Sequence, residues 1–184
     1  MKIAVVAFGR FNPPTLGHAK VVDTVIREAK KVGGTPMVYV SHTEDKKKNP
    51  LSYKTKVSLL SKATKGVVKN DPENKVKNIF DLLKAINGKF DVVYVVAGSD
   101  RVSEYQSKLD QYNGKDYTFK EIHTVSAGER DPDADDTSGI SGTKMRQFVV
   151  DGDYESFKKN LFVGAKDALA KPIFDEIKKN LGIQ

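Results

Sequence analysis

The chain has 184 residues, of which 39% are hydrophobic and 30% charged, a composition that suits one globular domain and excludes a wholly disordered chain. Cysteine is absent, so the fold depends neither on disulfides nor on an oxidising compartment. No apolar run approaches the ~20 residues of a membrane span, and the first residues lack the pattern of a secretion signal. We therefore expect a protein of the cytoplasm with no membrane partner.

The net charge of +7 comes mainly from lysine and raises the question of nucleic acid as a partner. The only dense run is Lys46-Lys47-Lys48, and further lysines are scattered through 54–77. Interleaved aromatic residues, a recognition helix or an arginine-rich arm would indicate polynucleotide binding, and the sequence has none of them. The charge pattern favours solvated lysines that attract small phosphorylated ligands.

The first part of the chain predicts a strand, a helix and a second strand. The apolar run 3–8 is typical of a strand buried on both faces. Helical spacing begins at Ala19 and ends at Gly33-Gly34, and 36–41 has the pattern of a second strand. The turn 9–18 ends a strand and precedes a helix, so backbone N–H groups and the helix dipole favour an anion there.

Later segments continue the alternation of strands and helices. Helices are expected at 51–65, 78–86 and 102–112 and from about 141, strands at 91–97 and 119–125, and a helical region at 154–181. Pro172 is expected to break that last region or to start a new helix near Lys171, and its apolar positions suggest packing on the sheet. The predicted fold is α/β: a Rossmann-like doubly wound parallel sheet in a single domain, with C-terminal helices.

Asp100 is the most informative of the polar residues that follow the strand 91–97. If that strand neighbours the first one, Asp100 comes near the turn 9–18, because ligands bind beyond the carboxyl ends of parallel strands. Asp100 is equally a candidate N-cap for the helix at 102–112, and one residue can do both.

An acidic stretch holds Asp131, Asp133, Asp135 and Asp136 and invites comparison with a metal site. It lacks the glycine and the terminal glutamate of a calcium loop. A solvated loop or lid is therefore favoured, and no metal site is assigned.

Residues 141–146 form a second phosphate-type feature at a helix start. A hydroxyl from Ser141 or Thr143 would lie beside the first N–H groups of the helix, and Arg146 reaches the same point one turn later. The alternative is an ordinary Ser141 N-cap with an exposed arginine. Only the pairing with the turn 9–18 favours the phosphate site. Neither the P-loop pattern nor the dinucleotide glycine fingerprint occurs, which disfavours a P-loop enzyme and a dinucleotide oxidoreductase.

Two segments resemble the signatures H/T-x-G-H and I-S-x-T-x-x-R of the nucleotidylyltransferase superfamily: Gly9-Arg10-Phe11-Asn12-Pro13-Pro14-Thr15-Leu16-Gly17-His18 and Ile140-Ser141-Gly142-Thr143-Lys144-Met145-Arg146. Gly98-Ser99-Asp100 is similar to the G-x-D of its adenylyltransferases. The resemblance covers residues 1 to about 150 and leaves 151–184 as helices packed on the same domain.

The opening G-x-F-N-P-P-T and Asn49-Pro50-Leu51-Ser52 are most similar to nicotinamide-nucleotide adenylyltransferases. Thr15 replaces the first histidine of the motif, and a lysine stands where the 49–56 segment of relatives often has arginine. Small stand-alone enzymes of this type also occur in tailed phages, so a phage source is open.

The resemblance implies transfer of AMP from ATP to nicotinamide mononucleotide, or to a similar phosphorylated acceptor, with release of pyrophosphate. Such a reaction needs positioning and charge neutralisation more than covalent help from the protein. The residues implied as catalytic are His18, Thr15 and Arg146. Those implied in nucleotide binding are Gly9, Arg10, Phe11, Gly17, Ser141 and Thr143. Those implied in acceptor binding are Asp100, Lys46, Lys54 and Lys56. Mg²⁺ is expected to arrive with the triphosphate, which requires no protein-only metal site.

Two alternatives stay open. Cytidylyl transfer from CTP to a phosphorylated alcohol or sugar uses the same motifs. A nucleotide-binding or structural subunit would keep the fold without the chemistry. The sequence also leaves open whether the chain forms a homo-oligomer.

Overall fold

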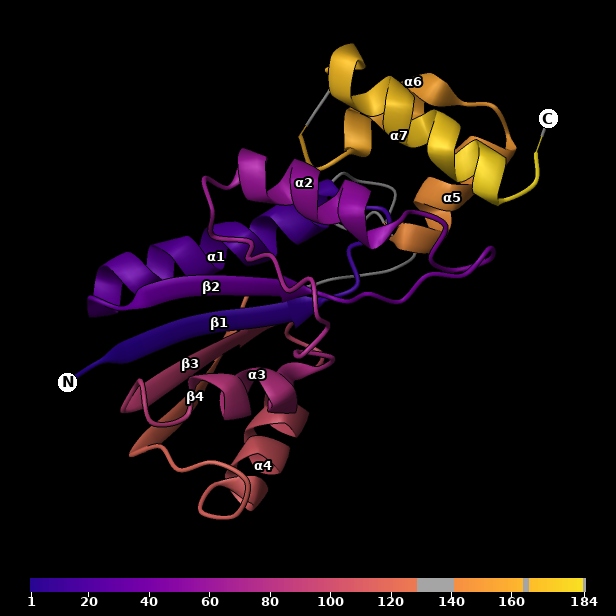
Figure 1. Cartoon of the computed structure of the whole chain (residues 1–184). Coiled ribbons are helices and arrows are strands. Elements are labelled where there is room, and N and C mark those ends of the chain that lie inside the picture. Colours follow the sequence, from indigo (N-terminus) through magenta and orange to yellow (C-terminus); the bar gives the residue numbers. More distant parts are fainter. Residues whose placement is uncertain (129–140, 164–165, 184) are drawn as a thin grey trace.

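The computed structural model describes residues 1–128, 141–163 and 166–183, and these residues are built around a four-stranded sheet (Figure 1). The strands are β1 (Ile3–Gly9), β2 (Thr35–Val40), β3 (Val92–Ala97) and β4 (Glu121–Ser126). Their order is β2-β1-β3-β4, and every ladder is parallel. The α/β doubly wound fold predicted from the sequence is confirmed.

Helices cover both faces of the sheet. In the described ranges they are α1 (Leu16–Val32), α2 (Tyr53–Ala63), α3 (Ile79–Ile86), α4 (Val102–Tyr112), α5 (Gly142–Val150), α6 (Tyr154–Asn160) and α7 (Asp167–Asn180). Helices α1 and α2 lie on one face of the sheet, and α3 and α4 lie on the other (Figure 1). None of these helices is long and apolar enough to cross a membrane.

Strand β1 is buried on both faces, as its continuous apolar run predicts. Val5 and Ala7 pack in the cluster that includes α1 and α2, whereas Ala4 and Val6 pack with α3. The chain leaves β1 for β2 through α1 on one face, and it reaches β3 through α3 on the other. The connections therefore diverge between β1 and β3, which opens a crevice at the carboxyl ends of these two strands.

Helix α1 begins at Leu16, earlier than the start at Ala19 that the apolar spacing predicts. Thr15 is its N-cap and shares a capping box with His18. Because the cap follows Pro14 directly, the motif residues Gly17 and His18 belong to the first turn of the helix and not to a loop.

The C-terminal helices pack on one another and not on the sheet, contrary to expectation. Helices α5, α6 and α7 form an apolar cluster with Leu51, the residue that precedes the Ser52 cap of α2. The cluster includes no strand residue in the described part of the chain. The helix that carries the second motif is therefore anchored through Met145 and Val149 to α6 and α7 (Figure 1).

Pro172 lies inside α7 and breaks nothing, so the expected interruption near Lys171 is wrong. The helices are separated instead between Asn160 and Asp167. Ile173 and Phe174 are buried next to the proline, and the packing of this face outweighs the backbone hydrogen bond that proline cannot donate.

Replacing Pro172 with Ala should raise the free energy of unfolding by about 1–3 kcal/mol, because alanine restores the missing N–H donor at an exposed helical position. Urea denaturation of the variant and of the wild-type protein measures the difference. A lower midpoint for Pro172→Ala would contradict this account of α7.

Candidate active site

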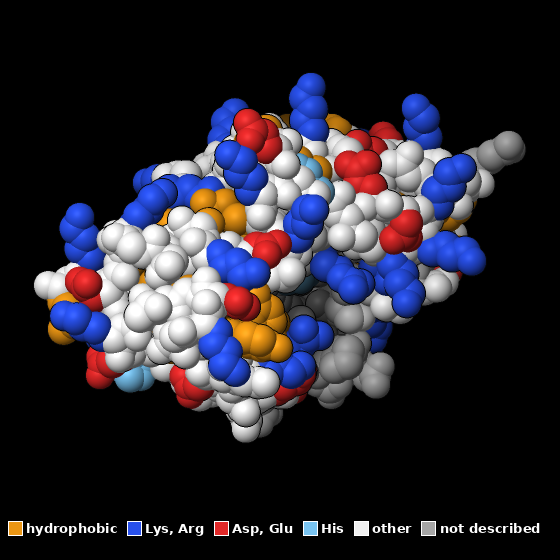
Figure 2. Space-filling view, turned by 60° about the horizontal axis from the view of Figure 1, so that its bottom comes forward, with side chains coloured by type: hydrophobic (Ala, Val, Ile, Leu, Met, Phe, Trp, Pro, Cys, Tyr) orange, Lys and Arg blue, Asp and Glu red, His pale blue; other side chains and the backbone are white. Residues whose placement is uncertain are grey.

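A cavity of about 680 Å³ opens at the carboxyl ends of β1 and β3. Five cationic side chains line it: Arg10, Lys48, Arg101, Lys108 and Arg146. Among the described residues, none of those that line it is an aspartate or a glutamate. In Figure 2, Lys and Arg side chains border a hollow near the middle of the face, with hydrophobic side chains at one side of it. Because the charged side chains of the described lining are all positive, the cavity indicates an anionic ligand.

His18 is held in the first turn of α1 by its contacts with Thr15. The Oγ1 atom of Thr15 accepts the His18 backbone N–H at 3.3 Å, and Nδ1 of His18 accepts the Thr15 backbone N–H at 3.0 Å. The ring of Phe11 meets the imidazole edge-on, with centroids 4.5 Å apart. Because Nδ1 accepts a backbone N–H, the ring proton in this arrangement is on Nε2, which makes His18 a donor at the cavity wall.

The turn after β1 has an irregular backbone that side chains from elsewhere hold in place. Phe11 has a φ of 49°, and the Asn12–Pro13 peptide bond is cis. The side chain of Asn12 exchanges two hydrogen bonds of 2.9 Å with the backbone of Leu51. Gly9 lets the Phe11 ring approach, since a Cβ at Gly9 would lie 3.2 Å from the ring.

Lys56 of α2 is fully buried beneath this turn. Its Nζ donates hydrogen bonds to the carbonyl of Arg10 at 2.7 Å and to the carbonyl of Ser41 at 2.8 Å. Burial lowers the pKa of Lys56 to about 8, and the charge of Glu44 opposes this effect.

Arg146 connects the start of α5 to the turn after β1. Its Nη1 donates to the carbonyls of Asn12 at 3.1 Å and Lys48 at 2.9 Å, and its Nη2 donates to Oγ1 of Thr143 at 3.2 Å. Gly142 leaves room for this crossing, because a Cβ there would lie 3.0 Å from Nη1 of Arg146. Burial lowers the pKa of Arg146, an effect that the charge of Asp45 opposes, and the guanidinium stays charged. The two sequence motifs thus meet at one wall of the cavity.

The loop 45–49 folds around the carboxylate of Asp45. This group accepts the side-chain N–H of Asn49 at 2.8 Å and the backbone N–H groups of Lys47 and Lys48 at 2.9 and 2.6 Å. These hydrogen bonds, that of Asn49 above all, hold the pKa of Asp45 well below its usual range. In this loop the carbonyl of Lys48 accepts a hydrogen bond from Arg146, and the side chain of Lys48 lines the cavity.

The wall that α3 and α4 form was not predicted from the sequence. Phe80 comes from the first turn of α3, and Arg101, Tyr105 and Lys108 come from the start and one face of α4. The i, i+4, i+7 spacing of these last three residues is visible in the sequence and would have placed them on one helical face. Lys108 also forms an ion pair of 2.7 Å with Glu104, which lies outside the lining.

Six of the predicted catalytic and nucleotide-binding residues line the cavity: Gly9, Arg10, Phe11, His18, Thr143 and Arg146. The other three, Thr15, Gly17 and Ser141, do not. Thr15 caps α1 and holds His18, and Ser141 caps α5 by accepting the N–H of Lys144 at 3.1 Å. Thr15 and Ser141 are therefore helix caps beside the cavity and not part of its lining.

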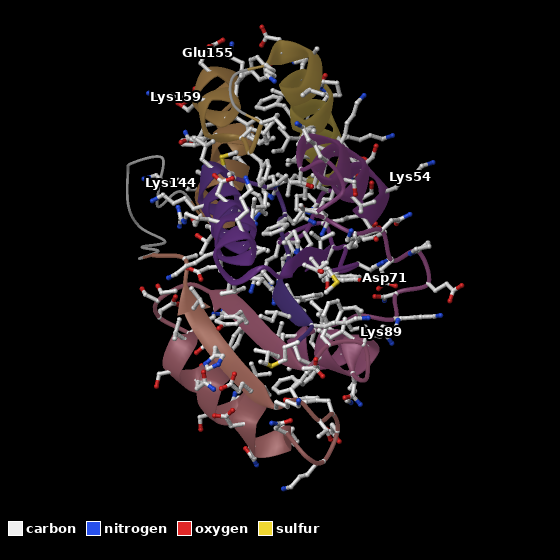
Figure 3. The ribbon with its side chains drawn as sticks, turned by 90° about the vertical axis from the view of Figure 1, so that its left-hand side faces the viewer. Lys54, Asp71, Lys89, Lys144, Glu155 and Lys159 are labelled. Carbon is white, nitrogen blue, oxygen red and sulfur yellow. The ribbon has the colours of Figure 1, made fainter. Side chains whose placement is uncertain are left out.

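The four residues expected at the acceptor are outside the cavity lining. Asp100 is exposed and does not cap α4, whose N-cap is Arg101. Lys46 is exposed in the loop 45–49, and Lys54 projects outward from α2 (Figure 3). Lys56 is enclosed by protein, so a ligand in the cavity cannot touch its ammonium group.

No cluster of three or more His, Asp or Glu side chains in the described ranges could hold a metal ion. The acidic stretch 131–136 and Ile140 of the second motif lie outside those ranges. The expectation of a lid there therefore stays a prediction.

The buried charge of Lys56 should make stability depend on pH. The pKa falls from its ordinary 10.5 to about 8 on folding, so between these values the unfolded chain binds more protons. The contribution of Lys56 to the free energy of unfolding then rises with pH, by roughly 3 kcal/mol over the whole interval.

Chemical denaturation of the wild-type protein and Lys56→Met at about pH 7.5 and about pH 10 tests this sign. The unfolding free energy of the wild type minus that of the variant should be more positive at the higher pH. A difference that is constant or falls would contradict it.

Comparisons with solved structures agree on the fold. A candidate nicotinate-nucleotide adenylyltransferase from Vibrio parahaemolyticus matches with a TM-score of 0.57 and 16% identity, over 94% of this chain and 99% of that one. TmcAL from Thermotoga maritima matches with a TM-score of 0.57 and 12% identity, over 97% of this chain and 57% of TmcAL. The same protein bound to alpha-thio ATP matches with a TM-score of 0.56 and 11% identity, over 97% of this chain and 56% of that one.

No curated protein matches the sequence. The family model described as Cytidylyltransferase-like matches residues 6–148, a span that begins inside β1, runs through β4 and contains the cavity residues from both motifs. The chain belongs to this cytidylyltransferase-like family, within the nucleotidylyltransferase superfamily.

Proposed function

We propose that the protein transfers AMP from ATP to nicotinamide mononucleotide, or to a similar phosphorylated acceptor, and releases pyrophosphate. The observation that carries the proposal is the cavity with five cationic and no acidic side chains among its described lining residues. A triphosphate and a phosphorylated acceptor bring several negative charges into one site, and cations on every wall offset their repulsion. Family membership supports nucleotidyl transfer as the reaction.

The triphosphate fits the wall where the two motifs meet. His18, Thr143 and Arg146 line this wall beside the N-terminus of α5, which favours negative charge. An acceptor phosphate oxygen would form a bond to the α-phosphorus while the bond from that phosphorus to the bridging oxygen of pyrophosphate breaks. The Nε2–H of His18 would donate a hydrogen bond to the oxygen on which charge grows. TmcAL, which has this fold, binds alpha-thio ATP.

The acceptor fits the opposite wall, which α3 and α4 form. Phe80 and Tyr105 offer two aromatic rings for a flat base, and Arg101 and Lys108 offer two charges for a phosphate. An aromatic ring and a phosphate in one small molecule describe a mononucleotide better than a phosphorylated sugar or alcohol. This wall therefore favours nicotinamide mononucleotide over the acceptors of cytidylyl transfer.

Mg²⁺ is proposed to enter with the triphosphate. Its preferred ligands are oxygens, and the described lining offers no carboxylate, so phosphate oxygens and water would supply most of its ligands. When bound, the ion would neutralise charge on the phosphates. The protein residues then contribute position and hydrogen bonds.

Pyrophosphate release from a panel of nucleoside triphosphates and acceptors tests the proposal. ATP with nicotinamide mononucleotide should give the highest rate. Preference for CTP with a phosphorylated alcohol or sugar would replace the proposal with cytidylyl transfer. Binding of ATP without pyrophosphate release from any acceptor would show a subunit that lacks the chemistry.

Replacing His18 with Ala should lower kcat by ~10²-fold or more, because the substitution removes a donor that acts in the transition state. The fold should persist at a cost of about 1 kcal/mol for the lost cap. His123→Ala, on β4 and outside the cavity lining, is the matched control and should retain wild-type turnover. Equal kcat values for His18→Ala and the control would refute the role of His18.

Replacing Arg101 with Met should raise KM for the acceptor by about 10-fold and leave KM for ATP within about twofold, because the charge on α4 faces the proposed acceptor only. Arg27→Met, an exposed arginine of α1 outside the cavity lining, controls for net charge. A rise in KM for ATP alone would contradict this assignment, because it would indicate that the α4 wall binds the triphosphate and the opposite wall binds the acceptor.

A further inference from the structure

The two strands that flank the site stop pairing just before the turn that carries it. The last ladder bond joins the N–H of Ser41 to the carbonyl of Gly9 at 2.9 Å. Within the described ranges, the next carbonyls, of Arg10 and Ser41, accept no backbone N–H from a neighbouring strand. Both accept hydrogen bonds from Nζ of Lys56, so one buried side chain replaces the backbone ladder at the point where β1 and β2 separate.

The Arg10 carbonyl belongs to the peptide unit that leads into Phe11. Phe11 has a left-handed backbone with a φ of 49°, which a non-glycine residue adopts only when its surroundings fix it. Its ring is buried and packs edge-on against His18. The direction of the Arg10 carbonyl therefore bears on the position of the imidazole.

Asn12, the residue after Phe11, connects this turn to Arg146 of the second motif. The carbonyl of Asn12 accepts Nη1 of Arg146 at 3.1 Å, and the Asn12 side chain is bonded to the backbone of Leu51. Leu51 and Lys56 belong to one short stretch of chain, which includes the first turn of α2. This stretch therefore contacts both ends of the segment 10–12: Lys56 bonds Arg10, and Leu51 bonds Asn12.

We infer that Lys56 is a positioning residue: through the carbonyls of Arg10 and Ser41 it fixes residues 10–12 and so places His18 and Arg146 about the reacting phosphate. The inference rests on the proposed function for its catalytic consequence. Lys56 does not touch the cavity, so its effect on the reaction passes through the turn alone.

Lys56→Met tests the inference, because methionine keeps the apolar stem and removes every donor. Turnover of the best substrate pair should fall by ~10-fold or more while KM for ATP changes less than about threefold, since misplacement by a fraction of an ångström penalises the transition state most. Hydrogen exchange followed by mass spectrometry should show faster exchange in residues 9–12, with β3 unchanged.

Lys56→Arg should restore kcat to within about threefold of the wild type, because a guanidinium can donate to both carbonyls. Lys62→Met, an exposed lysine on the same helix, is the matched control and should behave as the wild type. If Lys56→Met does not fold, Lys56→Gln takes its place: its amide keeps one donor group, but it ends one bond short of the lysine Nζ and cannot reach both carbonyls, so the same fall in kcat and the same faster exchange are expected.

A folded Lys56→Met with kcat within about twofold of the wild type would overturn the inference. So would a fall in kcat with unchanged exchange in residues 9–12, or one that Arg does not rescue. If the wild-type protein releases no pyrophosphate from any acceptor, the proposed function fails, and the exchange measurement still decides whether Lys56 holds the turn.

Discussion

Backbone groups that leave a strand inside a protein must find new hydrogen-bond partners, and the site of this protein is built on how that need is met. Beyond Gly9 the ladder ends, and partners for the turn come from distant parts of the chain. Lys56 binds the carbonyl of Arg10, Arg146 binds the carbonyl of Asn12, and the backbone of Leu51 binds the Asn12 side chain. The geometry of the site therefore exists only when α2 and α5 have packed against the turn.

Positive charge serves two purposes in this arrangement. Lys56 is buried, and two carbonyl dipoles compensate a charge that is costly to remove from water. Arg10, Lys48, Arg101 and Lys108 are exposed around the cavity, where they act on a ligand. Lys108 is paired with Glu104 outside the lining, but no carboxylate in the described lining offsets the charges of Arg10, Lys48 and Arg101, and the low-dielectric walls concentrate their field in the cavity.

The elements with strong local signals were predictable. The continuous apolar runs identify β1 and β3, and Asn78 and Ser52 are the N-caps of α3 and α2. The errors arise where a contact outweighs the local signal. A capping box starts α1 before its apolar spacing begins, and burial of one face of α7 keeps Pro172 inside the helix.

The sequence by itself determined the fold class, the two motifs and their order along the chain, because apolar periodicity, caps and turn residues are local properties. It also identified His18 and Arg146 as residues of one site. Only the tertiary structure decided that Lys56 is buried while Lys48 and Arg101 face the cavity, since the burial of a lysine or arginine side chain depends on which distant elements pack around it. The acceptor wall on α3 and α4 likewise appears only when the sheet brings its two faces together at the ends of β1 and β3.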